Sequence, residues 1–158
     1  MNSLIRSGAA GFLATVPMTI VIFGGRTLGL LRTPPPVQIT ANVQRRLTNV
    51  EDAPEHIPEP VFQASWLLSH FGYGAGCGVL YSLLGPLLLR PLALRGLAYG
   101  LGVWGISYIN LIPQLRLYPP VREDRLSRTA VMIAAHVVYG VALSVLERQL
   151  GQRDSRSP

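Results

Sequence analysis

His70–Gly74 reads His-Phe-Gly-Tyr-Gly, and His136–Gly140 reads His-Val-Val-Tyr-Gly. Both copies follow the pattern His-x-x-Tyr-Gly and are in register, 66 positions apart. Each lies inside an apolar run long enough to cross a bilayer, whose hydrocarbon core needs about 20 residues of helix. A histidine is costly in hydrocarbon and there usually faces a partner inside the protein. The repeat therefore predicts a membrane protein with two similar halves, each holding one histidine at a matching depth.

The composition also indicates an integral membrane protein. Hydrophobic residues make up 49% of the 158 residues and charged residues 14%, against roughly a quarter charged in ordinary soluble domains. The net charge of +6 comes from arginines that lie almost entirely between or beside the apolar runs, where they suit lipid phosphates. We therefore expect the lipid bilayer as a partner, and no nucleic acid. The length fits a single membrane domain over residues 1–158.

Four apolar runs qualify as membrane-spanning segments, at about 7–31, 64–89, 92–112 and 129–146. In lipid each backbone amide must be bonded within its own segment, so these runs predict helices. Apolar side chains also recur at helical spacing over about 36–49, which predicts a short amphipathic helix, either in the membrane interface or capping the bundle. The predicted fold is an all-α bundle of four transmembrane helices arranged as two similar helical hairpins.

The membrane orientation has only a weak signal in the sequence. The arginines divide almost evenly between the two sides of the predicted bundle, so the positive-inside rule gives no clear bias. We expect both termini in the cytoplasm, because the acidic loop after the amphipathic helix is the easier one to leave outside.

The glycines of the apolar runs predict close helix crossings. Positions i, i+3 and i+4 share one helix face, so the histidine, tyrosine and glycine of each repeat form one stripe. Small residues at four-residue spacing let neighbouring backbones approach in lipid. The glycines expected to pack in this way are Gly74, Gly78, Gly96, Gly100 and Gly140.

The repeated polar residues His70, Tyr73, His136 and Tyr139 are the candidate intramembrane polar or ligand site. The ordinary interpretation is that each neutral imidazole bonds a tyrosine or a backbone carbonyl inside the bundle. A second interpretation is axial ligation of a haem, or binding of another metal, by His70 and His136 across a pseudo-twofold axis. A third is a proton relay through the four side chains.

Other polar residues of the apolar runs carry weaker expectations. Ser107, Tyr108 and Asn110 lie near the end of the third run, and we expect them at the membrane interface. The sequence contains no nucleophile–base–acid pattern, no phosphate-binding glycine loop and no cysteine-pair metal motif. No catalytic residue is therefore predicted.

Several short motifs occur in an order that resembles the YagU-like family of small bacterial inner-membrane proteins. The motifs are Gly8–Gly11, Ala14–Thr19, Pro34–Pro36, His70–Gly74, Gly100–Trp104 and Ile133–His136. They touch all four runs, from about residue 8 to 146. The resemblance implies a compact multi-span fold in a bacterial plasma membrane, and it carries over no activity and no catalytic residue.

Together, the repeat, the composition and the glycine pattern predict a small integral membrane protein without an evident catalytic site. The expected function is that of a structural or accessory subunit of a membrane complex, or of a homo-oligomer. A haem-binding or redox membrane subunit and a small transporter or proton-conducting protein are the alternatives.

Overall fold

The structure is a computed structural model that describes residues 2–50, 53–88 and 91–154. All regular elements among these residues are helical. Four long helical stretches are joined by short turns and by one longer connection that carries two smaller helices. The elements are α1 (Ser3–Thr27), α2 (Pro35–Thr48), α3 (Ala53–His56), α4 (Glu59–Leu84), the 3₁₀ turn η1 (Gly85–Leu87), α5 (Leu92–Trp104), the π-helical segment η2 (Gly105–Leu111), α6 (Ile112–Gln114), the 3₁₀ turn η3 (Val121–Glu123) and α7 (Leu126–Asp154).

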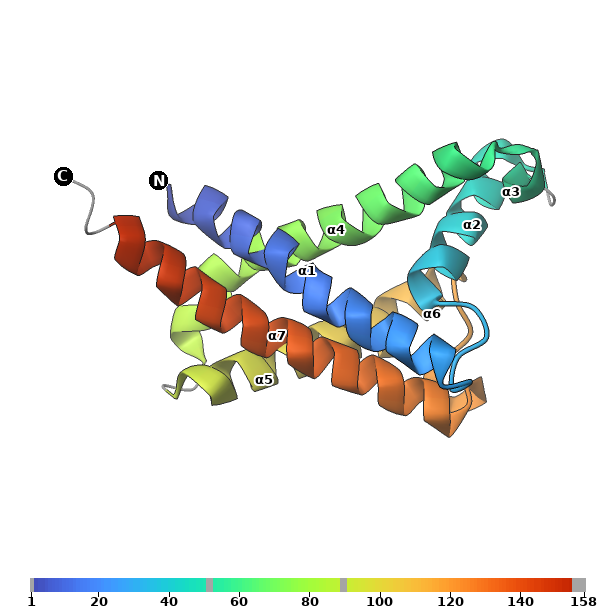
Figure 1. The fold of residues 1–158 in the computed structure, drawn as a ribbon. Coiled ribbons are helices and arrows are strands. Elements are labelled where there is room, and N and C mark those ends of the chain that lie inside the picture. The colour runs from blue at the N-terminus through green and yellow to red at the C-terminus, as the bar shows by residue number, and fades with distance from the viewer. Residues whose placement is uncertain (1, 51–52, 89–90, 155–158) are drawn as a thin grey trace.

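The long helices pack in the spatial order α4, α1, α7, α5 (Figure 1). The start of α1 and the end of α7 lie together at one end of the bundle, and α2, α3 and the loop before α7 lie at the other (Figure 1). An ion pair of 2.9 Å between Arg6 and Glu147 joins α1 to α7 near the chain ends. Among the described residues, α4 and α5–η2 do not pack extensively on each other.

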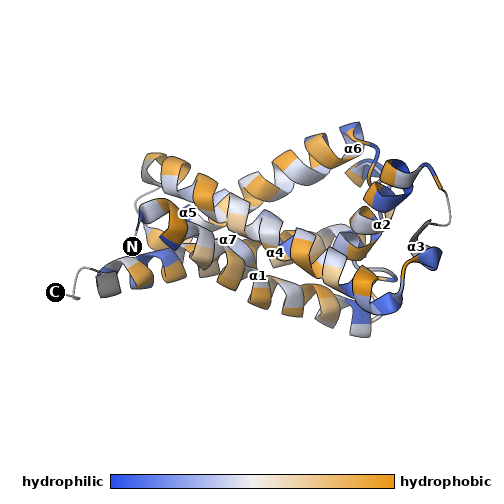
Figure 2. Cartoon of the chain, turned by 90° about the horizontal axis from the view of Figure 1, so that it is seen from above, coloured by the Kyte–Doolittle hydropathy of each residue, from blue (hydrophilic) through white to orange (hydrophobic). Residues whose placement is uncertain are grey.

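Three helical stretches are long and apolar enough to cross a membrane: Ser3–Thr27, Leu92–Gln114 and Leu126–Gln152. Large apolar side chains such as Ile20 and Ile106 point outward from them, each 67% exposed, as expected for helices that face lipid. Hydrophobic residues run along the long helices, whereas hydrophilic residues gather around α2 and α3 (Figure 2). The predicted run at 64–89 forms most of the helix α4, which is not among these three.

The first and last predicted runs correspond to α1 and α7, but these helices begin and end at other residues than predicted. The run predicted over 7–31 is a helix over Ser3–Thr27, because the chain leaves the helix at Leu28 and turns at Gly29, whose φ is 73°. The run predicted over 129–146 lies inside α7, which extends over Leu126–Asp154. Polar residues with good helix propensity continue α7 beyond its apolar part.

The second and third runs also begin or end at other residues than predicted. The run predicted to begin at Ala64 starts at Glu59, where Pro60 occupies the first turn of α4 and lacks only an amide that has no helical partner there. Its predicted end, Leu89, lies outside the described residues. The run predicted over 92–112 begins at Leu92 as expected and continues to Gln114.

Glycines hold two of the helix pairs in close contact. Between α1 and α4, a Cβ atom on Gly78 would collide with the carbonyl oxygen of Ser7, and one on Gly11 would collide with the backbone of α4. Between α5 and α7, a Cβ atom on Gly140 would collide with the carbonyl oxygen of Gly96. The absence of a Cβ atom at these glycines therefore allows the backbones of both pairs to come into contact.

The amphipathic helix predicted over 36–49 is α2, Pro35–Thr48. It lies against the start of α4, where the hydroxyls of Thr40 and Ser69 are 3.1 Å apart and Gln44 donates to the Ser65 hydroxyl at 3.1 Å. These contacts hold α2 against the end of the bundle, and its placement in the membrane interface stays a prediction.

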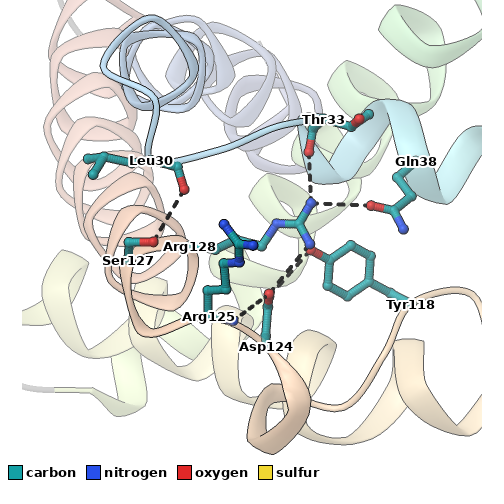
Figure 3. A network of polar contacts seen from close by, with 8 residues as sticks. All are labelled: Leu30, Thr33, Gln38, Tyr118, Asp124, Arg125, Ser127 and Arg128. Carbon is teal, nitrogen blue, oxygen red and sulfur yellow. Dashed lines mark hydrogen bonds and ion pairs between the residues drawn. The ribbon is translucent and has the colours of Figure 1, made fainter.

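A polar network fixes the end of the bundle next to α2 (Figure 3). The Arg128 guanidinium pairs with Asp124 at 3.4 Å and donates to the carbonyl of Thr33 at 3.1 Å and to the amide oxygen of Gln38 at 3.4 Å. It also lies over the ring of Tyr118, 5.2 Å from the centroid. Burial raises the pKa of Tyr118, and the neighbouring Arg128 opposes that shift. The network joins the α1–α2 connection, α2 and α7.

Candidate ligand-binding cavity

A cavity of about 260 Å³ lies between α1, α4, α5–η2–α6 and α7, with α2 over one end. Its walls are mostly apolar, and no lining residue carries a formal charge. Polar atoms come from a small set of side chains placed around it. These side chains are Thr15, Thr40, Ser69, His70, Tyr73, Ser107, Tyr108, His136 and Tyr139.

The glycine contacts explain why the cavity forms where it does. Gly74 and Gly140 bring α4 onto α1 and α7 onto α5, respectively. α4 and α5 meet at Tyr99, whose hydroxyl donates to the Cys77 carbonyl at 2.5 Å and whose ring packs against Tyr81. Beyond this contact, α4 and η2 are held by different central helices and do not pack extensively on one another in the described part of the chain. The space left between them is filled only partly by the large side chains of Tyr73 and Tyr108, and the remainder is the cavity.

His136 belongs to the buried wall of the cavity and is 3% exposed. Its Nδ1 lies 2.7 Å from the backbone carbonyl of Met132. Because a carbonyl only accepts hydrogen bonds, Nδ1 carries the proton and Nε2 of the neutral ring is an acceptor. The ring of Tyr108 meets the imidazole edge to face, with centroids 5.7 Å apart. Among the described residues, no group bonds Nε2.

His70 lies on the opposite wall and has the other tautomer. Its Nε2 is 3.1 Å from the hydroxyl of Thr19. That hydroxyl donates its proton to the carbonyl of Thr15 at 2.7 Å, so it accepts from His70 and Nε2 carries the proton. The ring of Trp66 lies 6.4 Å away, centroid to centroid. The two imidazoles thus make different hydrogen bonds. His70 bonds a side chain of α1, whereas His136 bonds a backbone carbonyl of its own helix, α7.

The two repeated tyrosines contact different helices. The Tyr73 hydroxyl lies 2.7 Å from the hydroxyl of Ser107, across the space between α4 and η2. The Tyr139 hydroxyl donates to the backbone carbonyl of Gly74 at 2.6 Å. Tyr73 is 50% exposed and Tyr139 is 2% exposed. Tyr139 therefore joins α7 to α4 inside the protein, whereas Tyr73 borders the outer side of the cavity.

The π-helical segment η2 supplies the wall opposite α4. Segments of this kind add a residue to a helical turn and occur often at functional sites. Ser107 and Tyr108 both lie in η2, and both are buried, at 2% and 7% exposure. η2 turns both side chains toward the bundle, and their placement at the depth of the membrane interface stays a prediction. Asn110 is exposed and bonds Gln114.

All four side chains of the sequence-predicted polar site, His70, Tyr73, His136 and Tyr139, line this one cavity. They do not bond one another directly in the structure. Sequence reasoning did not place Ser107, Tyr108 and Thr19 in the site. A signal for Ser107 was available, because a serine inside an apolar run must bond within the protein.

The same cavity contains the two residues considered as metal ligands. Among the described residues, no three or more histidine, cysteine, aspartate or glutamate side chains come together as a metal-binding group. His70 and His136 could therefore supply at most two protein ligands from this part of the chain. Cys77, which also lines the cavity, is buried and not bonded to another cysteine.

These features define an all-helical protein with membrane-length apolar helices around a small internal cavity. Over residues 1–157 the chain matches the family described as "Family of unknown function (DUF6789)". The chain belongs to this family. No curated protein and no solved structure matches it.

Proposed function

We propose that this chain is an integral membrane protein that binds a small, neutral, largely apolar molecule in its internal cavity. The observation that carries the proposal is the His136 ring, which lines the cavity while its Nε2 has no partner among the described residues. The unpaired acceptor nitrogen of a cavity-lining imidazole can take a hydrogen bond from a bound molecule. Cavities with apolar walls and a few convergent polar groups are typical ligand sites.

The proposal includes a fourth membrane-spanning helix, α4. The support is topological, because α1 ends and α5 begins at opposite ends of the bundle (Figure 1). If α1 and α5–η2–α6 both cross the bilayer, the chain must cross it again between them. The 26 residues of α4 extend about 39 Å at 1.5 Å per residue, which is enough for one crossing.

We further propose that the bundle consists of two similar helical pairs, α1 with α4 and α5 with α7. Support comes from matching contacts in the two pairs. Gly74 packs against Gly11 and Thr15 of α1, and Gly140, 66 positions later, packs against Gly96 and Gly100 of α5. Each glycine follows the tyrosine of its repeat, so the same stripe makes the crossing in both pairs.

The proposed location is the bacterial plasma membrane, with both termini in the cytoplasm. It rests on the YagU-like resemblance and on the acidic connection between α2 and α4, which the chain would leave outside. Membership of the YagU-like group is itself part of the proposal.

Extraction tests the binding function directly. The protein is purified in detergent, extracted with organic solvent, and the extract is analysed by mass spectrometry. We expect one neutral molecule in near-stoichiometric amount from the wild type. The cavity-filling variant Val103→Phe should lose it, and the matched variant Val61→Phe, at an exposed position outside the cavity, should keep it. Equal extracts from all three proteins would contradict the proposal.

A role as an accessory subunit or a homo-oligomer is a second candidate. It is favoured by Gly72 and Gly76 of α4, where an added Cβ atom would meet nothing within 4 Å. These glycines face outward at four-residue spacing, which suits a further helix in lipid. Replacing Gly76 with leucine should reduce the mass of the complex isolated under mild solubilisation. An unchanged mass would argue against this candidate.

Neither haem binding nor proton conduction is the function that the geometry supports best. At about 260 Å³ the cavity is below the range of roughly 300–1,000 Å³ for drug-sized ligands, and a haem is larger than most of these. For a relay, His70 and His136 bond Thr19 and Met132 and not each other. The four repeated side chains therefore form no continuous hydrogen-bonded path.

A further inference from the structure

We infer that the ligand is a phenol or quinol headgroup on an apolar chain, which enters from the lipid between α4 and η2 and donates a hydrogen bond to His136. This inference rests on the proposed binding function, and it adds the class of ligand and its route.

The route by which the ligand enters follows from the exposure of the residues that line each side of the cavity. On the side of α1 and α7, the lining residues Thr15 and Met132 are buried. On the side of α4 and the η2–α6 stretch, the lining residues Tyr73 of α4, Leu111 of η2 and Leu115 just after α6 are 50%, 44% and 46% exposed. These residues touch the cavity and also the outer surface, so the cavity opens sideways there. Because the leucine side chains at this opening are apolar, the opening suits contact with lipid acyl chains better than contact with water.

One hydrogen bond bridges this opening. The hydroxyls of Tyr73 on α4 and Ser107 on η2 are 2.7 Å apart, and the two elements do not otherwise pack extensively on each other among the described residues. A bond between two neutral hydroxyls is a weak closure compared with interlocked side chains. Tyr73 can therefore turn aside to admit a ligand without separating the glycine contacts at Gly74 and Gly78, which hold α4 to α1.

The headgroup follows from the polar atoms of the wall. Because no lining residue is charged, a charged ligand would be buried without a counterion, which is strongly unfavourable. Nε2 of His136 is an acceptor, so its partner must be a donor, and a ketone or ester carbonyl does not satisfy it. A hydroxyl does. The Tyr108 ring against His136 adds an aromatic surface that favours an aromatic ring.

The ligand class is tested with two probes that differ only in the hydroxyl, 4-dodecylphenol and dodecylbenzene. Each is titrated into the full-length protein in nanodiscs, and the fluorescence of Trp66 and Trp104 is followed. We expect saturable binding of the phenol that is at least tenfold tighter than that of dodecylbenzene. The His136→Phe variant should reduce this preference to less than threefold, provided that its circular dichroism matches the wild type. The His136→Asn variant, which restores an acceptor, serves as the second test and should recover part of it.

The route is tested by association rates measured with 4-dodecylphenol. Tyr73→Phe removes the bridging bond and should raise the association rate severalfold, and Leu111→Trp narrows the rim and should lower it. Unchanged rates in both variants overturn the route. Equal affinity for the two probes overturns the headgroup class, yet leaves the proposed function standing if the solvent extract still yields a bound molecule. An extract without any such molecule removes the proposed function itself.

Discussion

Tyr139 on α7 donates a hydrogen bond of 2.6 Å to the backbone carbonyl of Gly74 on α4. Both residues belong to the repeated His-x-x-Tyr-Gly segments, and the tyrosine of the second copy bonds the glycine of the first. The tyrosine of the first copy, Tyr73, bonds Ser107 instead. The same pattern therefore serves an internal link in one half of the chain and the border of a cavity in the other.

Removing the hydroxyl of Tyr139 should destabilise the protein. Tyr139→Phe keeps the ring that packs in the core and deletes only a buried hydrogen bond to Gly74. Such bonds contribute about 1 kcal/mol in water-soluble proteins and about 0.6 kcal/mol on average between membrane helices. We expect a lower midpoint of unfolding in a detergent titration. Tyr73→Phe is the control, and because Tyr73 is half-exposed it should change the midpoint less. The reverse order would contradict the assignment of the two tyrosines.

A single methyl group at a helix crossing should separate α5 from α7. In Gly140→Ala the new Cβ atom would collide with the backbone of Gly96 and Gly100, which cannot move aside as a flexible side chain can. Overpacking of this kind destabilises by about 1–3 kcal/mol. Thermal unfolding followed by circular dichroism measures the effect.

Gly102→Ala is the matched control for this substitution. It lies on the same helix pair, but an added Cβ atom at Gly102 meets nothing within 4 Å. Alanine is a better helix former than glycine, so this variant should be as stable as the wild type or slightly more stable. If both alanine variants unfold alike, the crossing does not depend on close backbone contact.

The sequence predicted the long helices and the shared location of the repeated residues because both depend on local pattern. The length of an apolar run predicts a membrane helix, and similar spacing from the helix starts predicts His70 and His136 at one level; both line the cavity. The exposure of a residue in a helix depends instead on which neighbour packs beside it. The burial of Ser107 and Tyr108 could not be predicted for this reason, since both lie in the π-helical segment η2, which turns them toward the bundle. The ends of α1 and α7 similarly depend on a turn and on polar residues that hydropathy does not detect.

The network around Arg128 should hold α2 in place over the cavity. Arg128→Gln removes the ion pair with Asp124 and the bonds to Thr33 and Gln38 (Figure 3). It leaves the Asp124 carboxylate, whose side chain is 9% exposed, without its cation. Losing a hydrogen bond to a charged group costs about 1.5–3 kcal/mol. Hydrogen–deuterium exchange over Pro35–Thr48 should become faster.

Arg122→Gln provides the control for the network. The Arg122 side chain is 81% exposed and pairs only with the adjacent Glu123 among the described residues, and exposed pairs of this kind contribute about 0–1 kcal/mol. Exchange over α2 should not change in this variant. Equal exchange in wild type and Arg128→Gln would mean that the contacts of α2 with α4 hold it without the network.

The fourth crossing by α4 can be tested at its two ends. In a Cys77→Ala background, single cysteines at Glu59 and Leu87 should react with a membrane-impermeant maleimide from opposite sides of sealed vesicles. The physical reason is the length of α4, which is about 39 Å from its 26 residues at 1.5 Å per residue, together with its position beside α1 (Figure 1).

Two further cysteines turn this into an internal comparison. Leu126→Cys, at the start of α7, should react from the same side as the cysteine at 59, and Gln152→Cys, near the end of α7, from the same side as the cysteine at 87. If the cysteines at 59 and 87 label from one side while those on α7 label from both, α4 does not cross. In that case α1 and α5 could not both cross in the arrangement of Figure 1, because α4 is the segment that connects their opposite ends.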